Sequence, residues 1–117
     1  MDRFRPEAFL PLSAVAFDIL LSLADGERHG YGILQEVEAR SGGALHAGTL
    51  YRALARLLET RLIDEIAAPS GAEHADERRR YYRLTDRGIA VARAEMRRLE
   101  AQLAAARSRR LLGASRP

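Results

Sequence analysis

The chain has no cysteine, no tryptophan and no lysine among its 117 residues, and it has no long apolar run. Without cysteine it cannot form a disulfide framework or use thiolate chemistry. Without an apolar stretch of about 18 residues it lacks the sequence pattern of a membrane-spanning helix. Its first residues, MDRFRPEAFLPLS, carry charges and prolines in place of the apolar core of a signal peptide. We therefore expect a soluble, cytoplasmic protein with no membrane partner.

Arginine supplies all of the basic side chains apart from three histidines, and the formal net charge is only +3. Such a small excess is weak evidence for a nucleic-acid partner, so the positions of the arginines matter more than their number. A chain of this length is expected to form one domain with a limited hydrophobic core.

The stretch HAGTLYRALARLLETRLI, residues 46–63, predicts an amphipathic helix that runs into a strand. On a helical wheel one face carries four leucines, Leu50, Leu54, Leu57 and Leu58. The opposite face carries Thr49, Arg52 and Arg56, and Tyr51 lies at its edge. A major groove admits such a helix, and arginine is the commonest reader of guanine edges, whereas the Tyr51 hydroxyl suits a phosphate. The alternative is an ordinary surface helix with a solvated charged face.

Two shorter helices are predicted before this one. Ser13 suits the N-cap of an apolar helix over residues 14–24, and a second helix is expected over about residues 31–40. The sequence Ser41-Gly42-Gly43 ends the second helix and gives a tight link to the basic one. Two helices joined in this way, the second basic on its outer face, form a helix-turn-helix.

A β-hairpin is predicted next, with strands over residues 62–67 and 78–84 and a small, polar loop between them. Such a hairpin after a helix-turn-helix is the wing of a winged helix. The second strand opens with three consecutive arginines, Arg78, Arg79 and Arg80, which suit phosphate contacts or a narrow minor groove. The alternative is that they pair with carboxylates of the same loop, Glu73, Asp76 and Glu77.

The last stretch predicts one long helix over about residues 86–112, followed by a frayed tail. Apolar residues recur at steps of three and four, in the manner of a heptad seam: Ile89, Ala92, Met96, Leu99, Leu103 and Ala106. A helix this long cannot bury its whole stripe on so small a domain, so we expect the seam to form a homodimer. The alternative is that the stripe packs only on the first helix of its own chain.

Three segments together carry a family resemblance: PLSAVAFDILLSLADGERHGYGI, GTLYRALARLLETRLI and RRRYYRLTDRG. From about Pro11 to about Gly88 the chain resembles the PadR family of bacterial transcriptional regulators. The resemblance implies a winged helix-turn-helix, a homodimer formed by the C-terminal and N-terminal helices, and repression of a nearby operon. It also implies a response to small aromatic or lipophilic compounds. One departure is His46-Ala47, where members of the family often have a capping pair such as Ser-Pro.

These observations define our predictions for fold and function. The fold is mainly α with a small β-hairpin: residues 1–85 form the DNA-binding region and residues 86–117 the dimerisation helix and tail, as one continuous domain. The function is that of a dimeric repressor on an inverted-repeat operator, released by a small lipophilic or aromatic effector. Any effector is expected where apolar helices converge at the dimer junction, near Phe17, Met96 and Leu99.

Catalytic and metal-binding patterns are absent from the sequence. The three histidines, His29, His46 and His74, lie in or beside separate predicted turns, without the i, i+4 spacing of a helical metal site. There is no Gly-x-Ser-x-Gly segment and no phosphate-binding glycine loop. We therefore expect no enzymatic activity, no cofactor and no metal. The alternative function is a winged-helix protein-interaction module without DNA binding.

Overall fold

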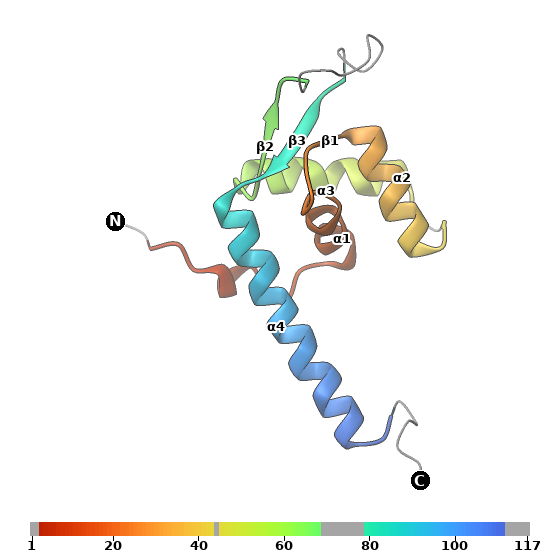
Figure 1. Ribbon diagram of the computed structural model, residues 1–117, viewed down its shortest axis with the longest axis vertical. Coiled ribbons are helices and arrows are strands. Elements are labelled where there is room, and N and C mark those ends of the chain that lie inside the picture. Colours follow the sequence, from red (N-terminus) through yellow and green to blue (C-terminus); the bar gives the residue numbers. More distant parts are fainter. Residues whose placement is uncertain (1–2, 44, 69–78, 112–117) are drawn as a thin grey trace.

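The computed structural model describes residues 3–43, 45–68 and 79–111. Along the chain it forms a 3-10 turn and four helices, with three short strands between them. These elements are η1 (Pro6–Phe9), α1 (Ala14–Ser22), β1 (Arg28–His29), α2 (Gly30–Ser41), α3 (Ala47–Glu59), β2 (Ile63–Ile66), β3 (Tyr81–Leu84) and α4 (Asp86–Ser108). In Figure 1 the strands lie at one end of the molecule, and α4 extends from the centre to the opposite end.

The buried core surrounds α1, which lies between α2, α3 and α4. Ile19 and Leu20 of α1 have no exposed surface, and neither has Leu50 of α3. The wheel predicted for α3 is confirmed, since its buried residues are Leu50, Leu54 and Leu57. Burial of each such side chain favours folding by about 1.5–3 kcal/mol relative to exposure. The apolar face of α3 therefore fixes the helix on the core and leaves its other face outside.

Side chains cap three of the four α-helices. Ser13 Oγ accepts a hydrogen bond from the Ala16 amide at 3.1 Å, as the sequence predicted for the start of α1. Thr85 Oγ1 accepts from the Gly88 amide at 3.0 Å and begins α4. The cap of α2 is His29, which the sequence placed in a turn. The fourth start, at His46 before α3, has no side-chain cap, in agreement with the weak capping expected there.

The sheet has three antiparallel strands in the order β1-β3-β2. The predicted two-stranded hairpin is present as β2 and β3, and the prediction missed β1. Strand β3 lies in the centre, where Tyr82 pairs with Arg28 of β1 on one side and with Glu65 of β2 on the other. A strand of two residues has no alternation to detect, which is why the sequence indicated only a turn at residues 28–29. We call β2 and β3 together the wing.

Several predicted boundaries differ from those of the structure. The first helix ends at Ser22, whose hydroxyl donates to the Ile19 carbonyl at 2.7 Å, and does not continue to residue 24. The long helix ends at Ser108, before the predicted residue 112. Before the first predicted helix, residues 6–9 form η1. The loop carboxylates Glu73, Asp76 and Glu77, together with Arg78, lie outside the described residues.

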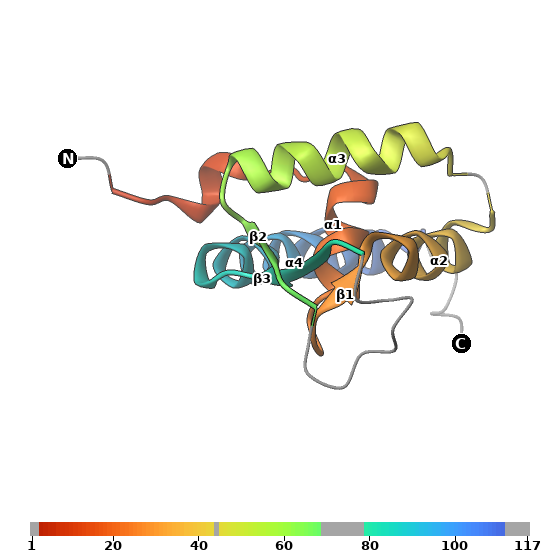
Figure 2. The same ribbon diagram turned by 90° about the horizontal axis from the view of Figure 1, so that it is seen from above.

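Residues 3–12, which we call the N-terminal arm, pack along the start of α4. The rings of Phe4 and Phe9 lie 5.7 Å apart, and the Arg87 guanidinium lies 4.7 Å from the centre of the Phe4 ring. A guanidinium over an aromatic face is attracted by the ring quadrupole. In Figure 2 the arm extends away from the body beside the C-terminal end of α3.

A buried carboxylate of α4 also holds the arm. Glu95 is 2 % exposed and accepts two hydrogen bonds from the Arg98 guanidinium, at 2.8 Å and 2.7 Å. These bonds lower the pKa of Glu95; burial opposes the shift, and a hydrogen bond from the Leu12 backbone adds to it. A buried acid held in this way stays ionised, so the arm and α4 are tied by a charged contact.

Candidate nucleic-acid interface

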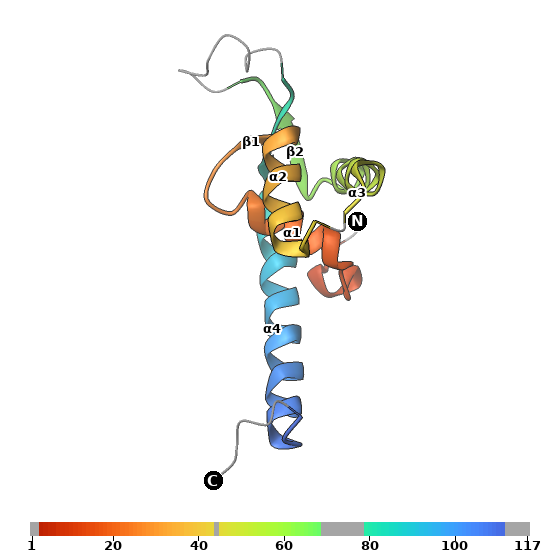
Figure 3. The same cartoon turned by 90° about the vertical axis from the view of Figure 1, so that its right-hand side faces the viewer.

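The outer face of α3 is uncovered and carries the predicted reading residues. Figure 3 shows α3 end-on, standing out from α2 and α4 on one side of the molecule. Arg52 is exposed on this face, and its Nη2 donates a long hydrogen bond of 3.4 Å to Thr49 Oγ1. Gly48 and Ala55, which lie about one helical turn before and after Arg52, are small and add little bulk beside it. The centre of the face is therefore a guanidinium and a hydroxyl with little bulk around them, which is a shape that fits base edges.

Tyr51 lies on the edge of α3 that faces the wing. Its side chain is 49 % exposed, and its ring lies against Gly30, the first residue of α2. A hollow of about 380 Å³ opens here between α2, α3 and the wing, lined by Gly30, Tyr31, Tyr51, Arg79, Arg80 and Tyr82. Burial raises the pKa of Tyr82, and the Glu65 carboxylate adds to the shift. Two exposed tyrosine hydroxyls and two arginines therefore converge on one hollow.

His29 connects the wing to α2, a role that the sequence did not reveal. Its Nδ1 accepts a hydrogen bond from the Gly32 amide at 2.9 Å and caps α2. Arg79 Nη1 lies 3.2 Å from His29 Nε2, and the Arg79 guanidinium lies 5.5 Å from the centre of the Tyr31 ring. No sequence signal marks this role, because serine, threonine, aspartate and asparagine are the preferred caps. The contacts place Arg79 beside the start of α2, just before β3 begins.

The neighbouring wing arginine is paired more loosely. Arg80 Nε lies 3.7 Å from Glu65 Oε2, and both side chains are largely exposed. An ion pair in solvent contributes little to stability, so Arg80 can exchange this carboxylate for a phosphate at small cost.

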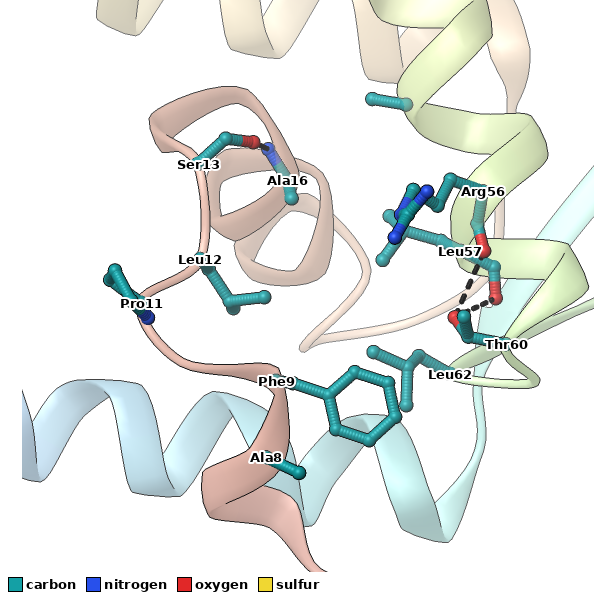
Figure 4. Close-up of a pocket in the computed structure, with 11 residues that line it drawn as sticks. Ala8, Phe9, Pro11, Leu12, Ser13, Ala16, Arg56, Leu57, Thr60 and Leu62 are labelled. Carbon is teal, nitrogen blue, oxygen red and sulfur yellow. Dashed lines mark hydrogen bonds between the residues drawn. The ribbon is translucent and has the colours of Figure 1, made fainter.

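Arg56 lies on the opposite edge of α3, and its direction differs from that of Arg52. A groove of about 480 Å³ separates this edge from the N-terminal arm and the start of α1. In Figure 4 the Arg56 side chain points into the groove, across from Leu12 and Ser13. Within the described residues its guanidinium forms no hydrogen bond or ion pair. The two arginines that the wheel placed together therefore face different surroundings.

The predicted dimer seam divides into two parts. Ile89 and Ala92 are partly covered within the chain, where α4 packs on α1, so the intramolecular alternative holds for the first turns. Farther along α4, Met96, Leu99 and Leu103 are 44 %, 36 % and 42 % exposed. Ala106 continues this stripe and is half-buried. Apolar side chains spaced along one helix at this exposure leave a stripe without a cover in the single chain.

Of the three residues predicted to bind an effector, only Met96 lines the groove between α1 and α4 in the described part of the chain. Met96 lines a groove of about 490 Å³ between α1 and α4, together with Leu20 and Ile89. Phe17 and Leu99 lie outside the lining of that groove.

The described part of the chain shows neither a metal cluster nor a membrane span. Within residues 3–43, 45–68 and 79–111, no three histidines or carboxylates are grouped so as to hold a metal ion. Over the same ranges, no helix is long and apolar enough to cross a bilayer. The groups that are gathered at the surface are arginines and tyrosines on α3 and the wing. An exposed basic helix on a helical core, flanked by a three-stranded sheet, defines a winged-helix protein.

Comparison with known proteins agrees with this class. Residues 19–94 match the model of the transcriptional regulator PadR-like family. Because the match covers most of the chain, the protein belongs to the PadR-like family of transcriptional regulators. It is accordingly a non-enzymatic protein that regulates transcription by binding DNA.

Solved structures of known proteins share this fold. A PadR family transcription regulator from Clostridium difficile R20291 is 23 % identical with a TM-score of 0.69, over 82 % of this chain and 97 % of that one. A PadR-like regulator from Bacillus cereus is 20 % identical with a TM-score of 0.67, over 87 % and 94 %. A transcriptional regulator from Clostridium thermocellum is 26 % identical with a TM-score of 0.65, over 80 % and 87 %.

Among curated proteins, an uncharacterized 37.1 kDa protein in transposon TN4556 of Streptomyces fradiae is 49 % identical over 45 residues. That match covers 38 % of this chain and spans only 13 % of the length of the relative. Its similarity is therefore local.

Proposed function

We propose that the protein is a dimeric repressor that binds an inverted-repeat operator through α3 and is released by a small lipophilic or aromatic effector. The observation that carries the proposal is the uncovered outer face of α3, with Thr49 and Arg52 at its centre. A major groove about 12 Å wide accepts a helix of about that diameter. In this arrangement Arg52 reaches a base edge and Arg56 approaches the side of the groove.

The wing supplies contacts that do not depend on sequence. Tyr51, Arg79 and Arg80 share one hollow beside α3, where a phosphate can accept from a hydroxyl and from guanidinium groups at once. Arg78 directly precedes Arg79 and Arg80 in the chain, and we propose that it acts in the same way, on phosphate or in the minor groove. These contacts hold the protein in register on the duplex while the α3 face reads the bases.

The second half of the α4 seam is the proposed dimer interface. Met96, Leu99 and Leu103 expose a stripe that an identical stripe of a second copy can cover. Ile89, Ala92 and Ala106 extend the contact at its two ends. The effector site is proposed at the same junction, where Phe17 and Leu99 of the two copies could close the groove lined by Met96. The regulator acts in the cytoplasm, where its operator DNA lies.

Affinity for the upstream region of the gene itself, measured across a salt series against scrambled DNA of equal length, tests the proposal. We expect a clear preference for the upstream region that persists as salt rises, with a footprint of two half-sites related by a dyad. Equal affinity for both DNAs would show that sequence is not read, and would favour a winged-helix interaction module instead. Release of the footprint by planar lipophilic compounds tests the effector part separately.

A further inference from the structure

The N-terminal arm lies on the edge of α3 that is opposite to the wing. Phe9 and Leu12 of the arm form one wall of the groove in Figure 4, and Arg56 and Thr60 of α3 stand across it. Tyr51 and the wing occupy the other edge. The recognition helix is therefore flanked on both sides, by the wing on one edge and by the arm on the other.

The arm brings two cations that have no partner. Arg3 and Arg5 are exposed, and the guanidinium of neither forms an ion pair or hydrogen bond with the described residues. Arg61, two residues after the end of α3, is also exposed; its carbonyl accepts a hydrogen bond of 2.7 Å from Thr85 Oγ1, but its guanidinium has no partner among the described residues. Exposed carboxylates of this region include Glu7 on the arm, Glu59 at the end of α3 and Asp86 at the start of α4, while the buried Glu95 is paired with Arg98. None of the guanidinium groups of Arg3, Arg5 and Arg61 is engaged by the described part of the chain.

The arm is also held in place before any partner arrives. Arg87 stacks on Phe4, and the buried Glu95 accepts a hydrogen bond from the Leu12 backbone. A segment that is already fixed loses little conformational entropy on binding, so its charges add to affinity more effectively than those of a free tail. Arg3 and Arg5 are thus presented on a supported segment.

A helix that fills a major groove has a phosphate strand along each of its edges, because helix and groove have similar widths. If the wing meets the strand on one edge, then the strand on the other edge runs past Arg56 and the arm. The arm packs on the start of α4, and the later turns of α4, which carry the exposed stripe, extend away from the wing (Figure 1). The dyad of the proposed dimer therefore lies on the arm side of each recognition helix.

We propose that the N-terminal arm is a second DNA-binding element, with Arg3 and Arg5 contacting the backbone and minor groove between the two half-sites. The inference rests on the proposed function, since it requires operator binding by a dimer. Arginine suits this position because its guanidinium is favoured in a narrow minor groove and binds phosphate in a bidentate manner. The operator is then contacted from both edges of each α3, by the wing outside and by the arm near the dyad.

The test compares the unmodified protein with the double variant Arg3→Ala/Arg5→Ala on one operator fragment. Each lost phosphate contact lowers the slope of log affinity against log salt by about 0.9, so the variant should lose about two units of slope. The advantage of the unmodified protein over the variant should then be about tenfold larger at 50 mM salt than at 200 mM. Hydroxyl-radical footprinting should show protection lost between the half-sites and kept within them.

A matched control removes the same charge from elsewhere. Arg97→Ala/Arg107→Ala changes two exposed arginines of α4 that have no partner among the described residues, and it should leave slope and footprint unchanged. Arg3→Lys/Arg5→Lys keeps the charge and should restore most of the slope. Thermal melting of the double variant should match that of the unmodified protein, because neither side chain supports the fold.

The outcomes separate this inference from the proposed function. If the unmodified protein protects two half-sites and the Arg3→Ala/Arg5→Ala variant has the same slope and the same central protection, the arm does not contact DNA, while the proposed function stands. An equal loss of slope in the α4 control would reduce the effect to net charge and overturn the inference. Absence of a specific footprint in the unmodified protein would overturn the proposed function itself, and the inference with it.

Discussion

Substitution of Gly88 by alanine tests how the segment that follows α3 is joined to α4. Gly88 lies in the first turn of α4 and is buried against the chain that follows α3. A Cβ there would overlap the Leu62 carbonyl oxygen and would lie 3.0 Å from Leu84 Cδ2 and 3.1 Å from the Leu62 carbonyl carbon. The Leu62 carbonyl cannot move aside freely, because it accepts a hydrogen bond of 3.2 Å from the Thr85 amide.

The magnitude follows from opposing effects. Overpacking of a buried site costs about 1–3 kcal/mol. Weakening of the bond between Thr85 and Leu62 adds about 0.5–1.5 kcal/mol. The higher helix propensity of alanine returns up to about 1 kcal/mol. We expect Gly88→Ala to lower the free energy of unfolding by about 1–3 kcal/mol.

Gly48 provides the matched control, since it also lies in the first turn of a helix. The nearest atom to a Cβ there is Arg52 Nη1 at 3.4 Å, which lies at the far end of a flexible side chain. Gly48→Ala should therefore raise the free energy of unfolding by about 0.5–1 kcal/mol, the ordinary gain for this exchange. The pair should differ in sign although the chemical change is the same.

Urea denaturation at one fixed protein concentration measures both effects, because the stability of a dimer depends on concentration. Each kcal/mol should also shift the melting temperature by about 4 °C. A Gly88→Ala variant as stable as the Gly48→Ala variant would refute the reasoning, since it would mean that α4 shifts relative to Leu62 without cost.

Three further predictions concern the interface, the reading face and pH. Leu99→Asp places an unpaired carboxylate in the proposed dimer seam, which costs several kcal/mol, so light scattering should give a monomer or an unfolded chain; an intact dimer would place the interface elsewhere. Arg52→Ala should weaken operator binding by about 1–3 kcal/mol and relax discrimination at one base pair, whereas Arg79→Ala should weaken operator and scrambled DNA alike; titrations with the opposite pattern would reverse the two roles. Folding lowers the pKa of Glu95, so the ionised side chain contributes stability above its ordinary pKa of 4.5, and this contribution is lost as pH falls through the folded-state pKa. In urea titrations, Glu95→Gln should therefore have a lower free energy of unfolding than the unmodified protein at pH 7, and the difference should vanish at low pH. A difference that does not change with pH would show that the charge of Glu95 does not matter.

Those parts of the fold that rest on local periodicity could be predicted from the sequence. The leucine spacing in α3 identified the buried face, and Ser13 caps α1 as its residue type indicated. The elements that were missed depend on contacts between distant residues. Strand β1 exists only because β3 lies beside it, and the cap formed by His29 follows from that pairing.

The candidate site shows the same limit. A helical wheel placed Arg52 and Arg56 on one face, because a wheel gives the direction of each side chain but not the elements that pack beside it. The groove beside Arg56 is made by the arm, and no local pattern links the arm to α3. Similarly, the seam residues Ile89 and Met96 occupy equivalent positions in the sequence pattern, but Ile89 is partly buried and Met96 is exposed. The pattern does not show how far α1 extends along α4. The DNA and effector contacts assigned to these residues stay predictions.

The register of the central strand sets an order for the assembly of the molecule. Strand β1 meets β3 by pairing Arg28 with Tyr82, so its partner is 54 positions away, beyond both α2 and α3. Closing so long a loop is entropically costly until the intervening helices have compacted the chain, whereas α2 and α3 form from contacts close in sequence. The helical unit must therefore fold before the sheet is complete. A chain that stops within β3 would keep α3 but would lack a complete central strand to pair with β1 and β2.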